Sequence, residues 1–205
     1  MLSYQTVHPD TLELMKTLAL QHEMQGMRLV GGTSLALQYG HRQSVDLDFF
    51  GKMNVSQDEI FDMLSRLNYD YKVLSQTKLI LQLVVNKIKV DIIDYSYAWI
   101  DEPVVDNGIV LASPKDIAAL KINAIEGRGS KKDFIDVYLL LQHFSLDEIL
   151  GFYAAKYPNH SMLMALKSLI YFEDAEPQIM PKMFIKTTWD EMKIAIVKAV
   201  NDYQK

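Results

Sequence analysis

The spacing of hydrophobic and polar residues predicts alternating helices and strands in the first half of the chain. Residues 8–24 carry apolar side chains at helical spacing, and Asp10 is the expected N-cap of this helix. The segment "MRLVGG" (27–32) reads as a short strand that ends in a Gly-Gly turn. The next segment, "TSLALQYG" (33–40), predicts a helix of about two turns that stops at Gly40.

Three further patterns belong to this mixed region. Residues 44–51, "SVDLDFFG", alternate between polar and apolar and predict a strand. Residues 56–67 predict an amphipathic helix, because Ser56 followed by Glu59 is a capping-box pattern. Residues 78–97 read as a β-hairpin whose turn lies at the Asn-Lys pair of "VVNKIKV".

The second half of the chain has helical patterns throughout. Ser113 as N-cap and Pro114 at the first helical position predict the start of a long helix. Further amphipathic segments follow at 131–144, 146–157, 161–172 and 189–203. The sequence therefore predicts an α+β fold, with a mixed sheet and helices over residues 1–110 and a helical domain over residues 111–205.

Composition narrows the class of protein. A chain of 205 residues with 49% hydrophobic residues can build one domain or two small ones. The absence of cysteine excludes disulfides and thiolate metal sites and favours a reducing compartment, so we expect a cytoplasmic protein. We see no signal peptide in "MLSYQTVHPD" and no apolar run long enough for a membrane span, so no membrane partner is expected. The net charge of −5 argues against a nucleic-acid coat protein but is compatible with a nucleic-acid enzyme.

The strand pattern at 44–51 contains two carboxylates. Asp46 and Asp48 are two residues apart, so they share one face of the strand, about 6.6 Å apart. Val45, Leu47 and Phe49 are then expected on the opposite face, in the core. Adjacent carboxylates repel each other, and a divalent cation such as Mg²⁺ removes that cost. We therefore predict that Asp46 and Asp48 bind metal.

Asp91 is the candidate for a third carboxylate. It lies in the apolar strand pattern "KIKVDIIDY". If this strand pairs beside residues 45–50, Asp91 faces Asp46 and Asp48. Three carboxylates can hold two metal ions about 4 Å apart, the arrangement used for in-line phosphoryl transfer.

A predicted phosphate site precedes the acidic strand. Gly31 and Gly32 allow close approach of a ligand to the backbone, and the helix N-terminus that follows favours anions. Thr33 and Ser34 add hydroxyl donors. An isolated Asp-x-Asp is usually solvated surface and an isolated Gly-Gly is usually a turn. The combination of both with a later strand aspartate favours catalysis.

Residues 30–50, "VGGTSLALQYGHRQSVDLDFF", resemble the signature of the nucleotidyltransferase fold of the DNA polymerase beta superfamily. The chain is more closely similar to the AbiEii/AbiGii-type toxin family. That similarity covers "HRQSVDLDFF", "VDII", "LKINAIEGRGSKKDFIDVYLLL" and "YFEDAEPQIMP", which follow one another in the family's order within residues 30–181.

The resemblance implies Mg²⁺-dependent transfer of a nucleoside monophosphate from an NTP to an acceptor hydroxyl. It places Arg42 and Ser44 in the active-site block, although Arg42 could equally neutralise the acidic cluster. It also implies that Lys121 contacts the triphosphate. The expected catalytic residues are Asp46, Asp48, Asp91 and Lys121. The expected substrate-binding residues are Gly31, Gly32, Thr33, Ser34, Arg42, Ser44, Arg128, Lys132 and Asp136.

Several candidates keep an ordinary alternative. Arg128, Lys131 and Lys132 form a basic cluster that binds phosphates or is simply solvated, and Asp136 belongs to the site or to an ion pair. Asp174 and Glu176 match a late block of the family, or form a polar turn before a proline.

Toxins of the resembled family modify RNA, notably the acceptor end of tRNA, and this implies RNA as acceptor and a cognate antitoxin as partner. Transfer to a protein side chain or to a small molecule such as an aminoglycoside remains open. A non-catalytic scaffold is the other alternative, and the three carboxylates argue against it.

Overall fold

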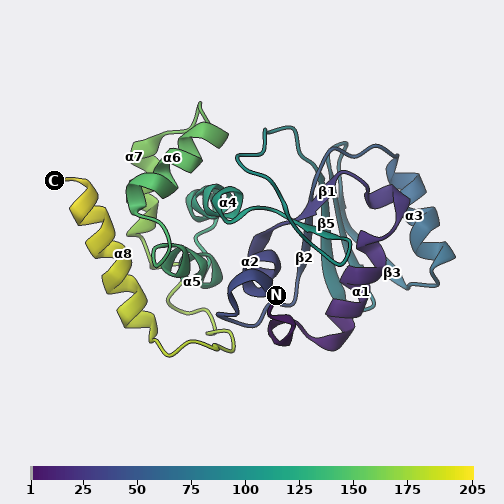
Figure 1. The fold of residues 1–205 in the computed structure, drawn as a ribbon, viewed down its shortest axis with the longest axis horizontal. Coiled ribbons are helices and arrows are strands. Elements are labelled where there is room, and N and C mark those ends of the chain that lie inside the picture. The colour runs from purple at the N-terminus through teal and green to yellow at the C-terminus, as the bar shows by residue number, and fades with distance from the viewer. Residues whose placement is uncertain (1) are drawn as a thin grey trace. The chain divides into compact units, whose positions relative to one another are not determined.

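A computed structural model describes residues 2–205, which form two compact units (Figure 1). The first unit contains the chain through Ser96 together with Pro103–Ala112. The second contains Tyr97–Glu102 together with Ser113–Lys205. The first unit is a mixed sheet with helices and the second is helical, so the predicted α+β class is confirmed. No helix within residues 2–205 is both long and apolar enough to cross a membrane.

The sheet of the first unit has seven strands among residues 2–205, in the order β3-β4-β5-β2-β1-β7-β6. Their bounds are β1 Met27–Leu29, β2 Leu47–Gly51, β3 Tyr71–Gln76, β4 Ile80–Val85, β5 Ile88–Asp94, β6 Val104–Asp106 and β7 Ile109–Leu111. The pairs β2–β5 and β1–β7 are parallel, and the other pairs are antiparallel. Two strands that are distant in sequence, β2 and β5, therefore lie side by side at the centre of the sheet.

The helices of the first unit are α1 Pro9–Ala19, α2 Gly31–Tyr39 and α3 Gln57–Arg66, with short 3₁₀ turns at Tyr4–Thr6 and His22–Met24. The capping box of α3 is present in full, as predicted. The predicted N-cap of α1 is wrong. Pro9 occupies the first helical position, so His8 is the cap and its side chain accepts a hydrogen bond from Asp10 N.

The chain around residues 30–50 differs from its prediction in two places. Helix α2 begins at Gly31, so the two glycines lie in its first turn and do not form a separate turn before it. It ends at Gly40, as predicted, with φ of 72°. Val45 was expected in the core but is 45% exposed, because β2 begins only at Leu47. Leu47 and Phe49 are buried, as predicted.

The hairpin of β4 and β5 turns at Asn86-Lys87, as predicted. Both turn residues have positive φ. Three strands have no counterpart in the sequence prediction. All residues of β3 are exposed, so it lacks the alternation that marks a half-buried strand. β6 and β7 have three residues each, too few for a pattern to be recognised.

The core of the first unit lies between one face of the sheet and helices α1 and α3. Leu47 and Phe49 of β2 and Val90 and Ile92 of β5 belong to this core, with apolar residues of both helices. Because side chains alternate along a strand, the residues between them project from the other face of the sheet.

The helical unit contains α4 Pro114–Gly127, α5 Lys131–Leu140, α6 Leu146–Lys156, α7 Met162–Leu169 and α8 Trp189–Tyr203. Ser113 caps α4 and Pro114 opens it, as predicted. Helix α4 packs against α5, α6 and α7, and α8 packs against α5, α6 and α7 (Figure 1).

The segment Tyr97–Glu102 is held in the helical unit by a buried ion pair. Lys156 Nζ lies 2.8 Å from Asp116 Oδ1, and both side chains are fully buried. Asp116 also accepts hydrogen bonds from the main-chain N–H groups of Ile100 and Asp101, and Lys156 donates to the carbonyl oxygen of Ala98. These contacts attach the segment to α4 and α6.

Candidate active site

Asp48 and Asp91 lie directly opposite each other on the two central strands. β2 and β5 run parallel, and Asp48 is the register partner of Asp91. Partners on neighbouring strands stand on the same face of a sheet about 4.8 Å apart. The strand pairing on which the predicted acidic site depends is therefore present. Asp48 and Asp91 lie on the face of the sheet opposite the core residues Leu47 and Phe49.

The two oxygens of Asp91 have different surroundings. The residue is only 7% exposed. Its Oδ2 accepts hydrogen bonds from Lys89 Nζ at 2.7 Å and Gln82 Nε2 at 3.0 Å. Its Oδ1 is buried and has no hydrogen-bond partner among residues 2–205. A buried polar atom without a partner is uncommon in a native fold and calls for a ligand or a functional reason.

These surroundings fit a divalent cation at Asp48 and Asp91. Mg²⁺ in proteins is usually held by one or two carboxylates, and water and phosphate oxygens complete its coordination. Within residues 2–205, no group of three or more His, Cys, Asp or Glu side chains is arranged to hold a metal ion. The structure therefore brings two of the three predicted metal ligands into register. Asp46 lies just before β2, and its role as the third ligand remains a prediction.

Gly31 and Gly32 leave room for side chains of the site itself. Gly31 has φ of 67°, and a Cβ atom built on it would overlap the carboxylate of Asp48. A Cβ atom on Gly32 would overlap the guanidinium of Arg42. The carboxylate of Asp48 therefore lies against the first residue of α2, where the helix dipole favours a negative charge.

Thr33, Arg42 and Ser44 surround this glycine pair. The Oγ1 atom of Thr33 lies 2.9 Å from Ser44 Oγ, and Thr33 also donates a hydrogen bond to the carbonyl oxygen of Asp46. Arg42 is 1% exposed, and its Nη1 donates to the carbonyl oxygen of Gln43 at 3.0 Å. Thr33 therefore connects the first turn of α2 to Ser44 and to the main chain of Asp46.

Ser34 differs from the other predicted phosphate ligands. It is fully buried, and its Oγ accepts a hydrogen bond from Gln38 Nε2 at 3.2 Å. The Gln38 side chain also donates to the carbonyl oxygen of Ala112 at 3.1 Å. These contacts connect α2 to the end of β7, so Ser34 has a structural role in addition to its predicted one.

In the helical unit, Lys121 is the centre of a buried ionic cluster. It is 5% exposed, and its Nζ lies 2.9 Å from Asp133 Oδ1 and 2.7 Å from Asp136 Oδ2. Burial by itself would raise the pKa of Asp133. The charges of Lys121 and Arg128 and the hydroxyl of Ser130 outweigh that effect and hold this pKa below its usual value.

Of the remaining candidates of the helical unit, Lys131 is only 7% exposed and donates hydrogen bonds to the carbonyl oxygens of Glu176 and Gln178, whereas Arg128 and Lys132 are more exposed. Arg128 lies 3.3 Å from Asp133 Oδ2 through its Nε, with 69% of its side chain exposed, and Lys132 is exposed on α5. Glu176 forms an ion pair with Lys193 and accepts a hydrogen bond from Trp189 at 3.0 Å, so it joins its loop to α8.

The sequence prediction did not include Lys89 and Gln82, the two donors to Asp91. Lys89 stands two residues before Asp91, so the shared strand face was a usable signal. Gln82 carried no such signal, because it lies next to Asp91 only through the pairing of β4 with β5.

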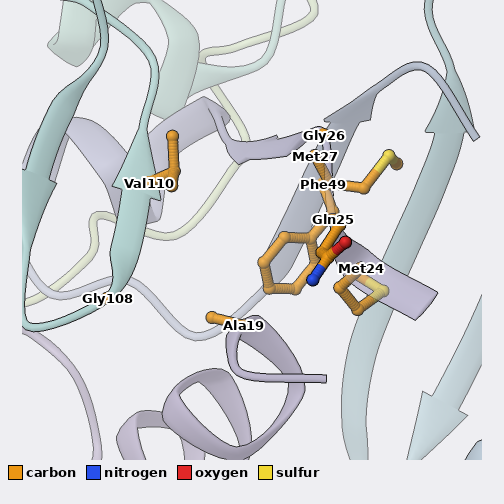
Figure 2. Close-up of a pocket in the computed structure, with 8 residues that line it drawn as sticks. All are labelled: Ala19, Met24, Gln25, Gly26, Met27, Phe49, Gly108 and Val110. Carbon is orange, nitrogen blue, oxygen red and sulfur yellow. The ribbon is translucent and has the colours of Figure 1, made fainter. Parts of the chain in front are cut away.

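A separate hollow of about 210 Å³ lies on the core side of the sheet (Figure 2). It is lined by Ala19, Met24, Gln25, Gly26, Met27, Phe49, Gly108 and Val110. Phe49 follows Asp48 in β2 but projects from the opposite face, so this hollow contains none of the predicted site residues.

Solved structures with similar folds include nucleotidyltransferases. One is described as a nucleotidyltransferase from H. pylori, with 19% identity, a TM-score of 0.59, and coverage of 95% of this chain and 94% of that chain. Another is MenT4, the nucleotidyltransferase toxin Rv2826c from Mycobacterium tuberculosis H37Rv, with 12% identity and a TM-score of 0.61. That similarity covers 93% of this chain and 81% of MenT4. At these identities the similarity establishes the nucleotidyltransferase fold.

The sequence comparisons show the family to which the chain belongs. The chain is 36% identical over 186 residues to "Uncharacterized protein aq_aa25" of Aquifex aeolicus (strain VF5), covering 85% of this chain and 86% of that protein. The family model "Nucleotidyl transferase AbiEii toxin, Type IV TA system" matches residues 13–204. The resemblance noted from the sequence is confirmed: this chain belongs to the AbiEii toxin family and is a nucleotidyltransferase.

Proposed function

We propose that this protein transfers a nucleoside monophosphate from an NTP to a hydroxyl of an RNA acceptor, with tRNA as the first candidate. The reaction depends on Mg²⁺ bound by Asp46, Asp48 and Asp91. The observation that carries this proposal is the register of Asp48 with Asp91, together with the buried Oδ1 of Asp91, which has no hydrogen-bond partner within residues 2–205. The family match supports a role as the toxin of a toxin–antitoxin pair, with a cognate antitoxin as partner.

The proposed step is an in-line displacement at the α-phosphorus. The acceptor oxygen forms the new P–O bond, and the bond between the α-phosphorus and the bridging oxygen breaks, so that pyrophosphate leaves with the electron pair. Asp91 accepts the proton of the acceptor hydroxyl. Mg²⁺ held by the three aspartates would supply positive charge that offsets the negative charge of the phosphate oxygens.

The start of α2 is the proposed binding site for the β- and γ-phosphates. The first N–H groups of a helix have no partner within the helix and attract anions. Gly31, Gly32 and Thr33 provide these groups, while Ser34, Arg42 and Ser44 complete the surrounding shell. Arg42 adds a buried positive charge against Gly32.

In the helical unit, Lys121 is the proposed group that neutralises charge on the leaving pyrophosphate. Asp133 and Asp136 hold its ammonium group in one place. Arg128 and Lys132 are exposed cations and are the proposed contacts to acceptor or nucleotide phosphates.

The test is a transfer assay with each α-labelled NTP, Mg²⁺ and total bacterial RNA. We expect label in tRNA-sized RNA from the wild type and none from Asp48→Asn or Asp91→Asn. Asp94→Asn is the matched control. Asp94 lies on β5, three residues after Asp91, and its Oδ1 accepts a hydrogen bond from the main-chain N–H of Met53. An asparagine keeps that acceptor, so this variant should label RNA like the wild type.

Each other result has a definite meaning. Label in protein or in a small molecule, lost in Asp48→Asn, would move the acceptor and retain the chemistry. Full labelling by Asp48→Asn would overturn the proposed site. The toxin role is tested in cells: expression of the wild type should arrest growth, and expression of Asp48→Asn should not.

A further inference from the structure

We infer that Lys89 and Gln82 are positioning residues for Asp91, which fix its Oδ2 and leave Oδ1 as the oxygen that binds metal. This inference rests on the proposed function, since it assigns the orientation of a proposed metal ligand. Neither residue belongs to the sets that the sequence predicted for catalysis or substrate binding.

The two donors reach Asp91 from different strands. Lys89 and Asp91 are two residues apart on β5 and therefore share a face of the sheet. Gln82 on β4 is the register partner of Asp91, so it stands beside it on that same face. Asp91 thus lies between Gln82 on one neighbouring strand and Asp48 on the other.

Both donors bind the same oxygen. Lys89 Nζ lies 2.7 Å and Gln82 Nε2 lies 3.0 Å from Oδ2, while Oδ1 has no hydrogen-bond partner among residues 2–205. Two hydrogen bonds to one oxygen prevent rotation of the carboxylate and keep the other oxygen directed away from both donors. A purely structural ion pair would satisfy both oxygens, because a buried acceptor without a partner is destabilising.

Lys89 also offsets charge at the site. Asp48 and Asp91 are like charges on adjacent strands, a destabilising arrangement for the folded protein. An ammonium group in contact with one of them reduces that repulsion while the oxygen for the metal stays available. The Lys89 side chain is 38% exposed, so part of it is in contact with solvent while its ammonium group contacts Asp91.

The test measures metal binding directly, with Mn²⁺ as the probe and electron paramagnetic resonance of the free ion as the readout. We expect Lys89→Met and Gln82→Met each to weaken Mn²⁺ binding by about tenfold or more, the effect typical of residues that orient a metal ligand. Lys89→Arg retains a donor and should recover most of the affinity. Lys72→Met, a change of the same kind at an exposed position of β3, should bind Mn²⁺ like the wild type.

A second measurement uses the metal-free protein. In a double-mutant cycle on the free energy of unfolding, Lys89→Met should have a different effect in the Asp91→Asn background than in the wild type. Thermal unfolding of each single variant confirms that it is folded. The cycle needs neither metal nor substrate, so it reports the Lys89–Asp91 contact by itself.

The outcomes separate this inference from the proposed function. If Lys89→Met and Gln82→Met bind Mn²⁺ like the wild type, the inference is wrong. If Lys89→Met loses transfer activity with Mn²⁺ affinity intact, Lys89 acts on the substrate and the inference is also wrong. Weakened Mn²⁺ binding without any RNA labelling by the wild type would overturn the RNA acceptor and support the inference. A wild type that binds no Mn²⁺ would overturn both.

Discussion

The carboxylate of Asp48 occupies the space that a side chain at residue 31 would need. Gly31 also has φ of 67°, a conformation that residues with a Cβ atom rarely adopt. The start of α2 and the acidic strand therefore fit together only because residue 31 is glycine.

Gly31→Ala should accordingly lose both stability and activity. The strained backbone costs about 1–3 kcal/mol, and displacement of the Asp48 carboxylate by about 1 Å lowers the transfer rate about 100-fold. Gly151→Ala, in helix α6, is the control, because a Cβ atom there would meet no described atom within 4 Å outside the neighbouring backbone of its own helix. That variant should be more stable by about 0.5–1 kcal/mol. Urea unfolding measures the stability of both variants and the transfer assay measures their activity. If Gly31→Ala were as stable as Gly151→Ala, the close fit of Gly31 against Asp48 would be contradicted.

Thr33→Val should weaken the connection between α2 and the acidic strand. The hydroxyl of Thr33 is hydrogen-bonded to Ser44 and to the carbonyl of Asp46, and the residue is 1% exposed. Loss of this hydroxyl leaves buried polar groups unsatisfied and costs about 1–3 kcal/mol. Thr33→Ser keeps the hydroxyl and should retain most of the stability and the activity. If valine and serine behave alike in denaturation, the hydroxyl is not the relevant group.

Lys121→Met should destabilise the protein strongly, whatever the role of Lys121 in the reaction. It removes the buried cation that Asp133 and Asp136 share, and breaking a buried ion pair costs about 3–5 kcal/mol. Arg128 remains beside Asp133. Lys115→Met, on the same helix, removes an exposed pair with Asp101 and should change stability little. Chemical denaturation measures the stability of both variants. Similar unfolding midpoints for Lys121→Met and Lys115→Met would contradict the predicted stabilising role of the buried cluster.

Asp133 should make the stability of the protein depend on acid pH. Its pKa in the folded protein lies below the ordinary value of 3.8, so the unfolded state binds a proton more readily. The stabilisation is present above the ordinary pKa and is lost as the pH falls through the lower folded value. We expect the stability difference between wild type and Asp133→Asn to shrink from about pH 5 downward. If the free energies of unfolding of the wild type and Asp133→Asn differed by the same amount at every pH, this prediction would be contradicted.

Lys156→Met should loosen the segment Tyr97–Glu102. The buried pair of Lys156 with Asp116 holds this segment through the carbonyl of Ala98 and the N–H groups of Ile100 and Asp101. Without the cation, the amides of Ile100 and Asp101 should exchange hydrogen faster. Unchanged exchange at both amides would show that the segment is held by other contacts.

Much of the local structure was predictable from short sequence patterns. The capping box of α3, the proline start of α4, the glycine end of α2 and the Asn-Lys turn were all confirmed, because each depends on residues within one turn of chain. The prediction failed where neighbours decide, as at Val45 and the exposed strand β3, because exposure there follows from what packs alongside.

The acidic residues show the same division. The sequence alone determined that Asp46, Asp48 and Asp91 occur in strand-like patterns beside a glycine pair, and that the chain resembles a nucleotidyltransferase family. Only the tertiary structure decided that Asp48 and Asp91 are register partners, and that Lys89 and Gln82 bind one oxygen of Asp91. The reason is physical: the hydrophobic pattern determines which face of a strand is buried, but hydrogen bonding between distant strands determines which residues meet across the sheet.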